Sequence, residues 1–142
     1  MTGPSTLHAG FAAKIGAVLD ALEMEGALPR GVARCGLTIE PPRDPSHGDL
    51  ATNAAMVLAK PAATNPRSLA EKIVAHLAAD PDISAAEIAG PGFINLRLDD
   101  GVWRRELAAI AALGPDYGRS TLGAGKRVEV VLELPGEELV AL

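Results

Sequence analysis

The sequence predicts an α+β domain in two layers, in which helices pack against a small antiparallel sheet. Some segments repeat apolar residues with helical spacing, whereas others alternate apolar and polar residues as strands do. The predicted order is helix, strand, two helices, hairpin, helix and strand, which is typical of an α+β fold with an antiparallel sheet. A length of 142 residues suits a single hydrophobic core.

Composition narrows the possible functions. The chain has 18 acidic and 13 basic residues, for a net charge of −5. Its overall charge therefore does not favour binding to nucleic acid, whose phosphates are negative. Any nucleic-acid role must depend on a local site or on a larger partner that carries the basic surface. Cys35 is the only cysteine, which excludes an internal disulfide and a multi-cysteine metal site. We expect no metal and no cofactor.

The sequence also carries no sign of a membrane or export signal. No segment approaches the roughly 18 apolar residues of a membrane span. The first basic residue is Lys14, so the basic start of a signal peptide is missing. We therefore expect a cytoplasmic protein.

The first predicted elements are a helix and a short strand. Residues 6–25 form an amphipathic helix that Ser5 or Thr6 can cap, with its apolar stripe at Leu7, Phe11, Ile15, Val18, Leu19 and Leu22. Residues 37–40 alternate apolar and polar side chains, which predicts a strand.

Two helices are predicted in the middle of the chain. The loop 43–48 leads to Asp49, which we expect to cap a helix over 50–59. A second helix begins where Asn65 precedes a proline, a combination of capping side chain and first helical residue. It ends at Asp80, again before a proline.

The pattern of residues 83–98 predicts a hairpin. Its turn contains Gly90-Pro91-Gly92, and we place Pro91-Gly92 at the centre of a type II turn. The second strand, 93–98, alternates strictly. Its aliphatic residues must face the core, so Phe93, Asn95 and Arg97 face outward.

The last predicted elements follow this strand. Asp99 or Asp100 caps a helix that carries Trp103, Leu107 and Ile110 and ends at Gly114-Pro115. Residues 116–126 form a glycine-rich connector, and 127–134 alternate again as a strand.

The outward face of strand 93–98 is the main candidate site. The ring of Phe93 can stack on an unpaired base, and the amide of Asn95 can donate to and accept from a base edge. The guanidinium of Arg97 can bind a phosphate through two hydrogen bonds. The alternative is structural: Phe93 packs under a loop and Arg97 is a solvated charge at the edge of the sheet.

We predict no catalytic residues. Ser46, His47 and Asp49 are too close in sequence to converge on one atom, and a turn leading into a helix cap explains them better. Gly125-Lys126 lacks the spacing and the hydroxyl residue of a phosphate-binding loop. A small free-standing enzyme would need a pocket around His47 with a perturbed carboxylate.

Three segments together resemble the N-terminal domain of bacterial arginyl-tRNA synthetases. Residues 45–55, PSHGDLATNAA, are similar to the family's H-G-D-[YL]-[AS]-[TS]-N-x-A stretch, and residues 89–98, AGPGFINLRL, to its A-G-P-G-F-I-N hairpin. Tyr117-Gly118 and the later Gly125-Lys126-Arg127-Val128 are similar to the passage into the catalytic domain. The resemblance covers about residues 6–133 in the same order and spacing.

The resemblance implies a non-catalytic tRNA-recognition domain of an arginine–tRNA ligase. Such a domain lies against the tRNA elbow and contacts a D-loop base through an aromatic residue and an amide, at the positions of Phe93 and Asn95. The implied partners are the arginine tRNA and the catalytic domain of the parent enzyme. The role of Arg97 as a phosphate contact is not part of the resemblance and is inferred only from the face on which its side chain is predicted to lie.

The resemblance also implies a division of the chain. Residues 1–115 correspond to the N-terminal α+β domain, and 116–142 to a connector and the start of a catalytic domain, with an atypical tail from Leu134. The family's H-x-G-H and K-M-S-K-like segments do not occur. We expect no activity from this chain alone, and the parent enzyme would be an ATP-dependent ligase. The alternative function is a protein-interaction or structural domain without RNA contact, in which the Phe93 face docks on a protein.

Overall fold

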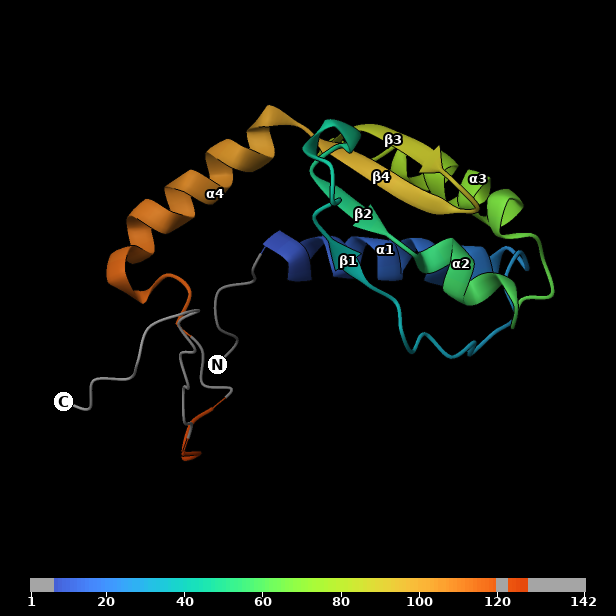
Figure 1. Ribbon diagram of the computed structural model, residues 1–142, viewed down its shortest axis with the longest axis horizontal. Helices are drawn as coiled ribbons and strands as arrows, with labels where there is room; N and C mark the ends of the chain where they lie inside the picture. The colour runs from blue at the N-terminus through green and yellow to red at the C-terminus, as the bar shows by residue number, and fades with distance from the viewer. Residues whose placement is uncertain (1–6, 120–122, 128–142) are drawn as a thin grey trace, which may run out of the picture.

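The structure has the two predicted layers (Figure 1). One layer is a four-stranded antiparallel sheet, and the other consists of the helices that cover one face of it. The structure is a computed structural model and describes residues 7–119 and 123–127. Its elements in chain order are α1 (Leu7–Met24), β1 (Ile39–Glu40), the 3-10 turn η1 (Pro45–His47), β2 (Leu50–Thr52), α2 (Ala54–Ala59), α3 (Pro66–Leu77), β3 (Ile83–Ala89), β4 (Phe93–Leu98), α4 (Asp100–Leu113) and the 3-10 turn η2 (Gly114–Asp116). The α+β prediction is confirmed.

The helices α1 and α3 form where the sequence predicts them. In α1 the buried residues are those of the predicted stripe, Phe11, Ile15, Leu19 and Leu22. At the start of α3, Oδ1 of Asn65 accepts a hydrogen bond of 2.8 Å from the N–H of Arg67. The predicted cap is therefore confirmed, and the proline at the first helical position has no N–H that would need a partner.

The sheet has the strand order β1-β2-β4-β3. Its second strand corrects the prediction of a helix over 50–59, because Leu50–Thr52 pair with β4 and the helix begins only at Ala54. Asp49 also does not cap that helix. Three residues are too short to reveal an alternating pattern, and the pairing with a strand about 45 residues later decides their conformation.

The hairpin β3–β4 forms as predicted, with Ala89 paired to Phe93 and Ile83 paired to Leu98. The turn differs from the prediction. The N–H of Gly92 donates to the carbonyl of Ala89, so Gly90 and Pro91 are the central residues instead of Pro91 and Gly92. Gly90 has φ +54°, which glycine adopts without strain.

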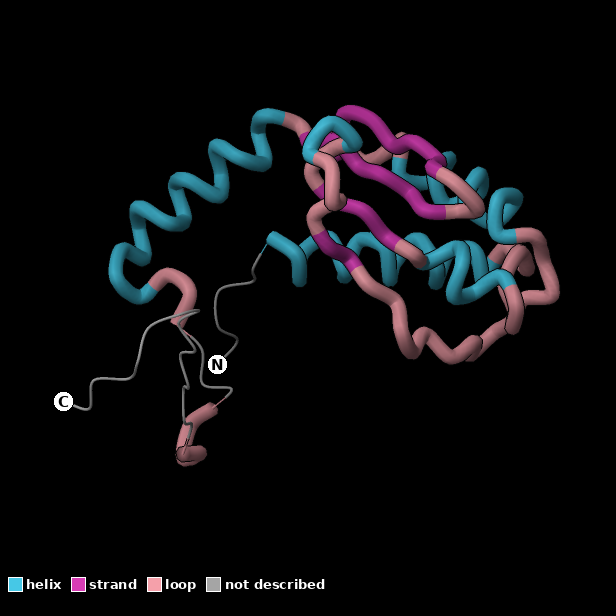
Figure 2. Tube along the Cα trace, in the orientation of Figure 1, coloured by secondary structure: helices cyan, strands magenta, loops and turns pink. Residues whose placement is uncertain are grey.

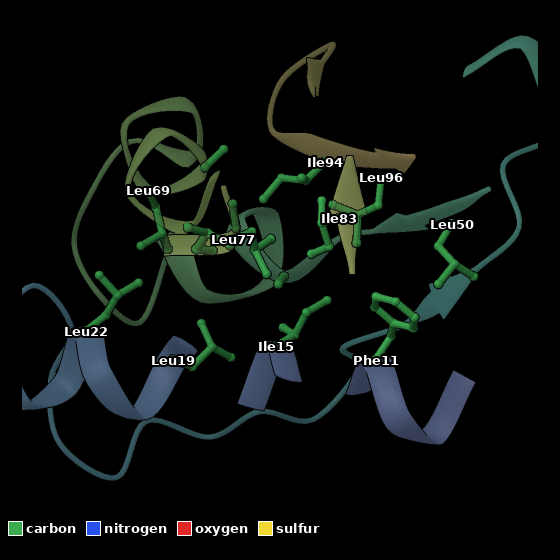
Figure 3. Close-up of a cluster of buried hydrophobic side chains, with 14 of the residues drawn as sticks. Phe11, Ile15, Leu19, Leu22, Leu50, Leu69, Leu77, Ile83, Ile94 and Leu96 are labelled. Atoms are coloured by element: carbon green, nitrogen blue, oxygen red, sulfur yellow. The ribbon is translucent and has the colours of Figure 1, made fainter. Parts of the chain in front are cut away.

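The core lies between the sheet and the helices (Figure 3). Phe11, Ile15 and Leu19 of α1 extend from below toward Ile94 and Leu96 of β4, and each of these five side chains is at most 3% exposed. The aliphatic residues of β4 thus face inward, as the alternation predicts. Among the described residues, no helix covers the opposite face of the sheet (Figure 1).

The helix α4 runs away from the sheet (Figures 1 and 2). Its predicted cap is confirmed, because Oδ1 of Asp99 accepts a hydrogen bond from the N–H of Gly101. Val102 is its only buried residue, whereas Trp103, Leu107 and Ile110 are 39%, 65% and 38% exposed. The strand predicted over 127–134 lies outside the described residues, apart from Arg127.

Candidate nucleic-acid interface

The uncovered face of β4 carries the three residues that the sequence singles out. Phe93 is 42% exposed, Arg97 is exposed and Asn95 is half-buried. The neighbouring Ile94, by contrast, has no exposed surface. The alternative in which Phe93 packs under a loop is not what the structure has.

The neighbours of these side chains on the same face differ in size and charge. In the sheet register, Ala89 pairs with Phe93 and Ala85 with Arg97, whereas Asn95 lies between Ala51 of β2 and the exposed Glu87 of β3. A methyl group rises little above a sheet, so Ala89 leaves room for a planar group to lie against the ring of Phe93.

Phe93 and Asn95 line one open pocket of about 440 Å³. This volume lies within the range of small-ligand sites, roughly 300–1,000 Å³. We call it the Phe93 pocket; it is bounded by Thr38, Glu40, Pro41, Pro42, Arg43, His47, Ala51, Thr52, Asn53, Ala89, Gly90, Phe93 and Asn95. The residues from the loop after β1 form a wall that the sequence alone did not reveal, because they join the hairpin only through β2.

Arg97 lies at the other end of β4, in a different depression of about 420 Å³. That depression also contains the carboxylates of Asp49, Asp99 and Asp100. Nη2 of Arg97 donates a hydrogen bond of 3.1 Å to the carbonyl of Ser46. The strand therefore places Arg97 on the predicted face, but the structure does not bring it into the pocket of Phe93 and Asn95.

The segment Ser46-His47-Gly48-Asp49 fixes the loop wall to β4. Gly48 has φ +129°, and a Cβ there would lie 2.6 Å from the carbonyl oxygen of Leu96. The N–H of Asp49 donates to that same oxygen at 2.8 Å, and its Oδ2 accepts from the N–H of Leu98 at 2.8 Å. These contacts give the segment a structural role, and its polar side chains form no catalytic triad.

Asn53 fixes the chain that leads into β1, before the loop wall begins. Its Oδ1 accepts a hydrogen bond of 2.8 Å from the N–H of Thr38, and its Nδ2 donates one of 3.0 Å to the carbonyl of Gly36. The oxygen and the nitrogen of this amide thus both hold the chain before β1 next to β2. Asn95 has no hydrogen bond from its side chain to another described residue, so its amide is available to a ligand.

Within the loop wall, Asp44 caps the 3-10 turn η1. The carboxylate of Asp44 accepts a hydrogen bond of 2.9 Å from the N–H of Ser46 at the start of η1. Hydrogen bonds from Ser46 hold the pKa of Asp44 below its ordinary value, and the charge of His47 acts in the same direction. This hydrogen bond stabilises the start of η1.

Within residues 7–119 and 123–127, no group of three or more His, Cys, Asp or Glu side chains is arranged to hold a metal ion. In the same part of the chain, every helix is too short or too polar to cross a membrane.

Comparison with known proteins gives one consistent result. The model of the family described as "Arginyl tRNA synthetase N terminal domain" matches residues 10–98, from α1 to the end of β4. The chain is 64% identical over 124 residues to an arginine–tRNA ligase of Novosphingobium aromaticivorans, which covers 87% of this chain and 21% of that protein. It is 57% identical over 109 residues to the ligase of Paracoccus denitrificans, covering 77% of this chain and 19% of that protein.

The chain spans about a fifth of the length of these relatives. The matched residues 10–98 include two of the three segments on which the resemblance rests, residues 45–55 and 89–98. The chain belongs to the arginyl-tRNA synthetase N-terminal domain family.

Proposed function

We propose that this chain is the tRNA-recognition part of an arginine–tRNA ligase, and that its Phe93 pocket receives a D-loop nucleotide at the elbow of the arginine tRNA. The observation that carries the proposal is the exposed ring of Phe93 next to the unpartnered amide of Asn95, in one open pocket. The parent ligase would act in the cytoplasm, where its tRNA is.

The chemistry of the pocket suits a base that has left its stack. The ring of Phe93 is exposed and pairs with the small Ala89, so a planar base can approach it, and stacking of this kind contributes about 1–3 kcal/mol per base. Asn95 lies two residues further along the same face. Its amide offers a donor pair and an acceptor, which is what hydrogen bonding to a base edge requires.

Arg97 is the third proposed tRNA contact. Because only Nη2 binds Ser46, other N–H groups of its guanidinium remain available for a phosphate. It would contact the backbone beyond the pocket and not the nucleotide inside it.

The direct test is the affinity of the 142-residue chain for labelled arginine tRNA at low salt. Phe93→Ala should raise the Kd by roughly 5- to 150-fold, the equivalent of one lost stack. Asn95→Ala should also weaken binding. Tyr117→Ala is the matched control, because Tyr117 is similarly exposed at 39% but lies after α4. If both site variants bind as tightly as the control, the proposal is wrong.

The second candidate function is protein docking, which the exposed face of α4 favours. Trp103, Leu107 and Ile110 recur at helical spacing, and a solitary 14-residue helix is only marginally stable in water. We propose that this face packs against the remaining part of the parent ligase. The two functions use different surfaces and are compatible.

Docking can be followed at Trp103, the only tryptophan of the chain. With 5-fluorotryptophan, the chain gives one fluorine NMR signal. That signal should shift when the Novosphingobium aromaticivorans ligase lacking its own matching segment is added. The variant Leu107→Glu should prevent the shift. An unchanged signal of the wild-type chain in the presence of that protein would exclude docking through α4.

A further inference from the structure

The Phe93 pocket has a basic side formed by Arg43 and His47. Both residues are exposed, and both line the pocket together with Phe93 and Asn95. Arg43 forms no ion pair or hydrogen bond with another described residue, so its guanidinium is free for a ligand. In a chain with a net charge of −5, this places a free guanidinium and an imidazole beside an aromatic ring.

Two acidic residues lie near the amide of Asn95. Among the described residues, Glu40 is the only acidic residue that lines the pocket, and Glu87 flanks Asn95 from β3. In the sheet register, Glu40 pairs with Ala51, which pairs with Asn95, so Glu40 belongs to the row of the amide. The carboxylate of Asp44 is engaged by the N–H of Ser46.

The loop that carries Arg43 and His47 is restricted by prolines before Arg43 and attached to β4 after His47. Pro41 and Pro42 precede Arg43 and restrict the backbone. After His47, the contacts of Gly48 and Asp49 attach the chain to β4. A cation on a preorganised loop loses less conformational freedom when it binds than one on a mobile segment.

The opposite end of β4 is less suitable for an anion. There Arg97 shares its depression with Asp49, Asp99 and Asp100, and it already donates to Ser46. The acidic residues in this depression weaken the attraction of Arg97 for a phosphate, so Arg97 would be the weaker of the two phosphate contacts.

We propose that Arg43, with His47 beside it, binds the phosphate of the nucleotide whose base stacks on Phe93. The base would lie on the ring, its edge toward Asn95, and its phosphate at the basic side of the same pocket. A guanidinium suits this task because it donates two parallel hydrogen bonds to phosphate oxygens. The inference rests on the proposed tRNA-binding function and adds the residue that binds the phosphate backbone of the tRNA.

The test measures the Kd of the 142-residue chain for labelled arginine tRNA over a series of salt concentrations. Arg43→Ala should raise the Kd by roughly five- to tenfold. It should also reduce the slope of log affinity against log salt by about 0.7–0.9, the value for one phosphate contact. Arg43→Lys should restore part of the affinity, and Arg43→Ala with His47→Ala should weaken binding further.

Arg104→Ala is the matched control, since it removes the same charge from an exposed position on α4. Circular dichroism on each variant confirms that the fold is retained. If Phe93→Ala weakens binding but Arg43→Ala behaves like Arg104→Ala, Arg43 does not bind the phosphate. The proposal that the pocket binds a base would still stand. If Phe93→Ala has no effect, the proposed function itself fails, and with it this inference.

Discussion

The carboxylate of Asp49 accepts a hydrogen bond of 2.8 Å from the main-chain N–H of Leu98, 49 residues later in the chain. The same residue donates its own N–H to the carbonyl of Leu96. Asp49 thus pairs with the end of β4 through both its backbone and its side chain. The candidate site depends on this contact, because it joins the loop wall to the strand that carries Phe93.

Asp49→Ala should lower the free energy of unfolding by about 1–3 kcal/mol, because it leaves the partly buried N–H of Leu98 without an acceptor. Asp49→Asn should lower it less, since an amide oxygen can still accept. Urea unfolding measures both changes. Glu71→Ala, an exposed position on α3, serves as the control. Equal stability of Asp49→Ala and this control would show that the hydrogen bond is not needed.

Gly48→Ala should be among the most destabilising small changes in the chain. Its φ of +129° disfavours any side chain, and strain of this kind amounts to about 1–3 kcal/mol. The added Cβ would also collide with the carbonyl oxygen of Leu96 at 2.6 Å. Gly16→Ala provides the contrast, because a Cβ there meets nothing within 4 Å and alanine favours a helix. Thermal unfolding should therefore move in opposite directions for the two variants.

Adjacent residues of β4 should respond very differently to truncation. Ile94→Ala removes a side chain with no exposed surface and should lower the free energy of unfolding by about 2–5 kcal/mol. Phe93→Ala should lower it by about 1 kcal/mol or less, because the ring is 42% exposed. Denaturant titration of the two variants tests which face of the strand is buried. A larger loss for Phe93→Ala would contradict the assigned faces.

The ion-pair cluster around Asp82 predicts a dependence of stability on pH. Nζ of Lys14 lies 2.6 Å from Asp80 and 3.0 Å from Asp82, and Arg105 also pairs with Asp82. The hydrogen bond from Lys14 lowers the pKa of Asp82 below its ordinary value of 3.8, against the opposing effect of partial burial. The stabilisation is therefore complete above pH 3.8 and is lost as the pH falls through the lower, folded-state pKa.

Asp82→Asn should accordingly be less stable than the wild type at neutral pH, and the difference should shrink in strong acid. Urea unfolding at a series of pH values measures the difference directly. Asp100→Asn is the control, as that carboxylate forms no ion pair with a described residue. A constant difference between wild type and Asp82→Asn at every pH would exclude a contribution from the charge of Asp82.

The sequence by itself determined the elements whose signals are local. The stripe of α1, the Asn65-Pro66 start of α3 and the alternation of β4 each depend on residues within one element, so their spacing was sufficient. The same alternation predicted that Ile94 is buried and that Phe93 and Asn95 share the open face. The family resemblance rested on the same hairpin, on residues 45–55 and on the segment that begins at Tyr117.

Only the tertiary structure decided the features that involve distant pairing. Residues 50–52 form a strand because β4 offers them hydrogen-bonding partners, and a local reading of the same residues favours a helix. Asp49 therefore binds Leu98 instead of capping a helix. The pairing of β1 with β2 and of β2 with β4 also brings Arg43 and His47 into one pocket with Phe93, about 50 residues away in sequence. Side-chain periodicity carries information about faces, but contacts between strands depend on long-range register, which local spacing does not encode.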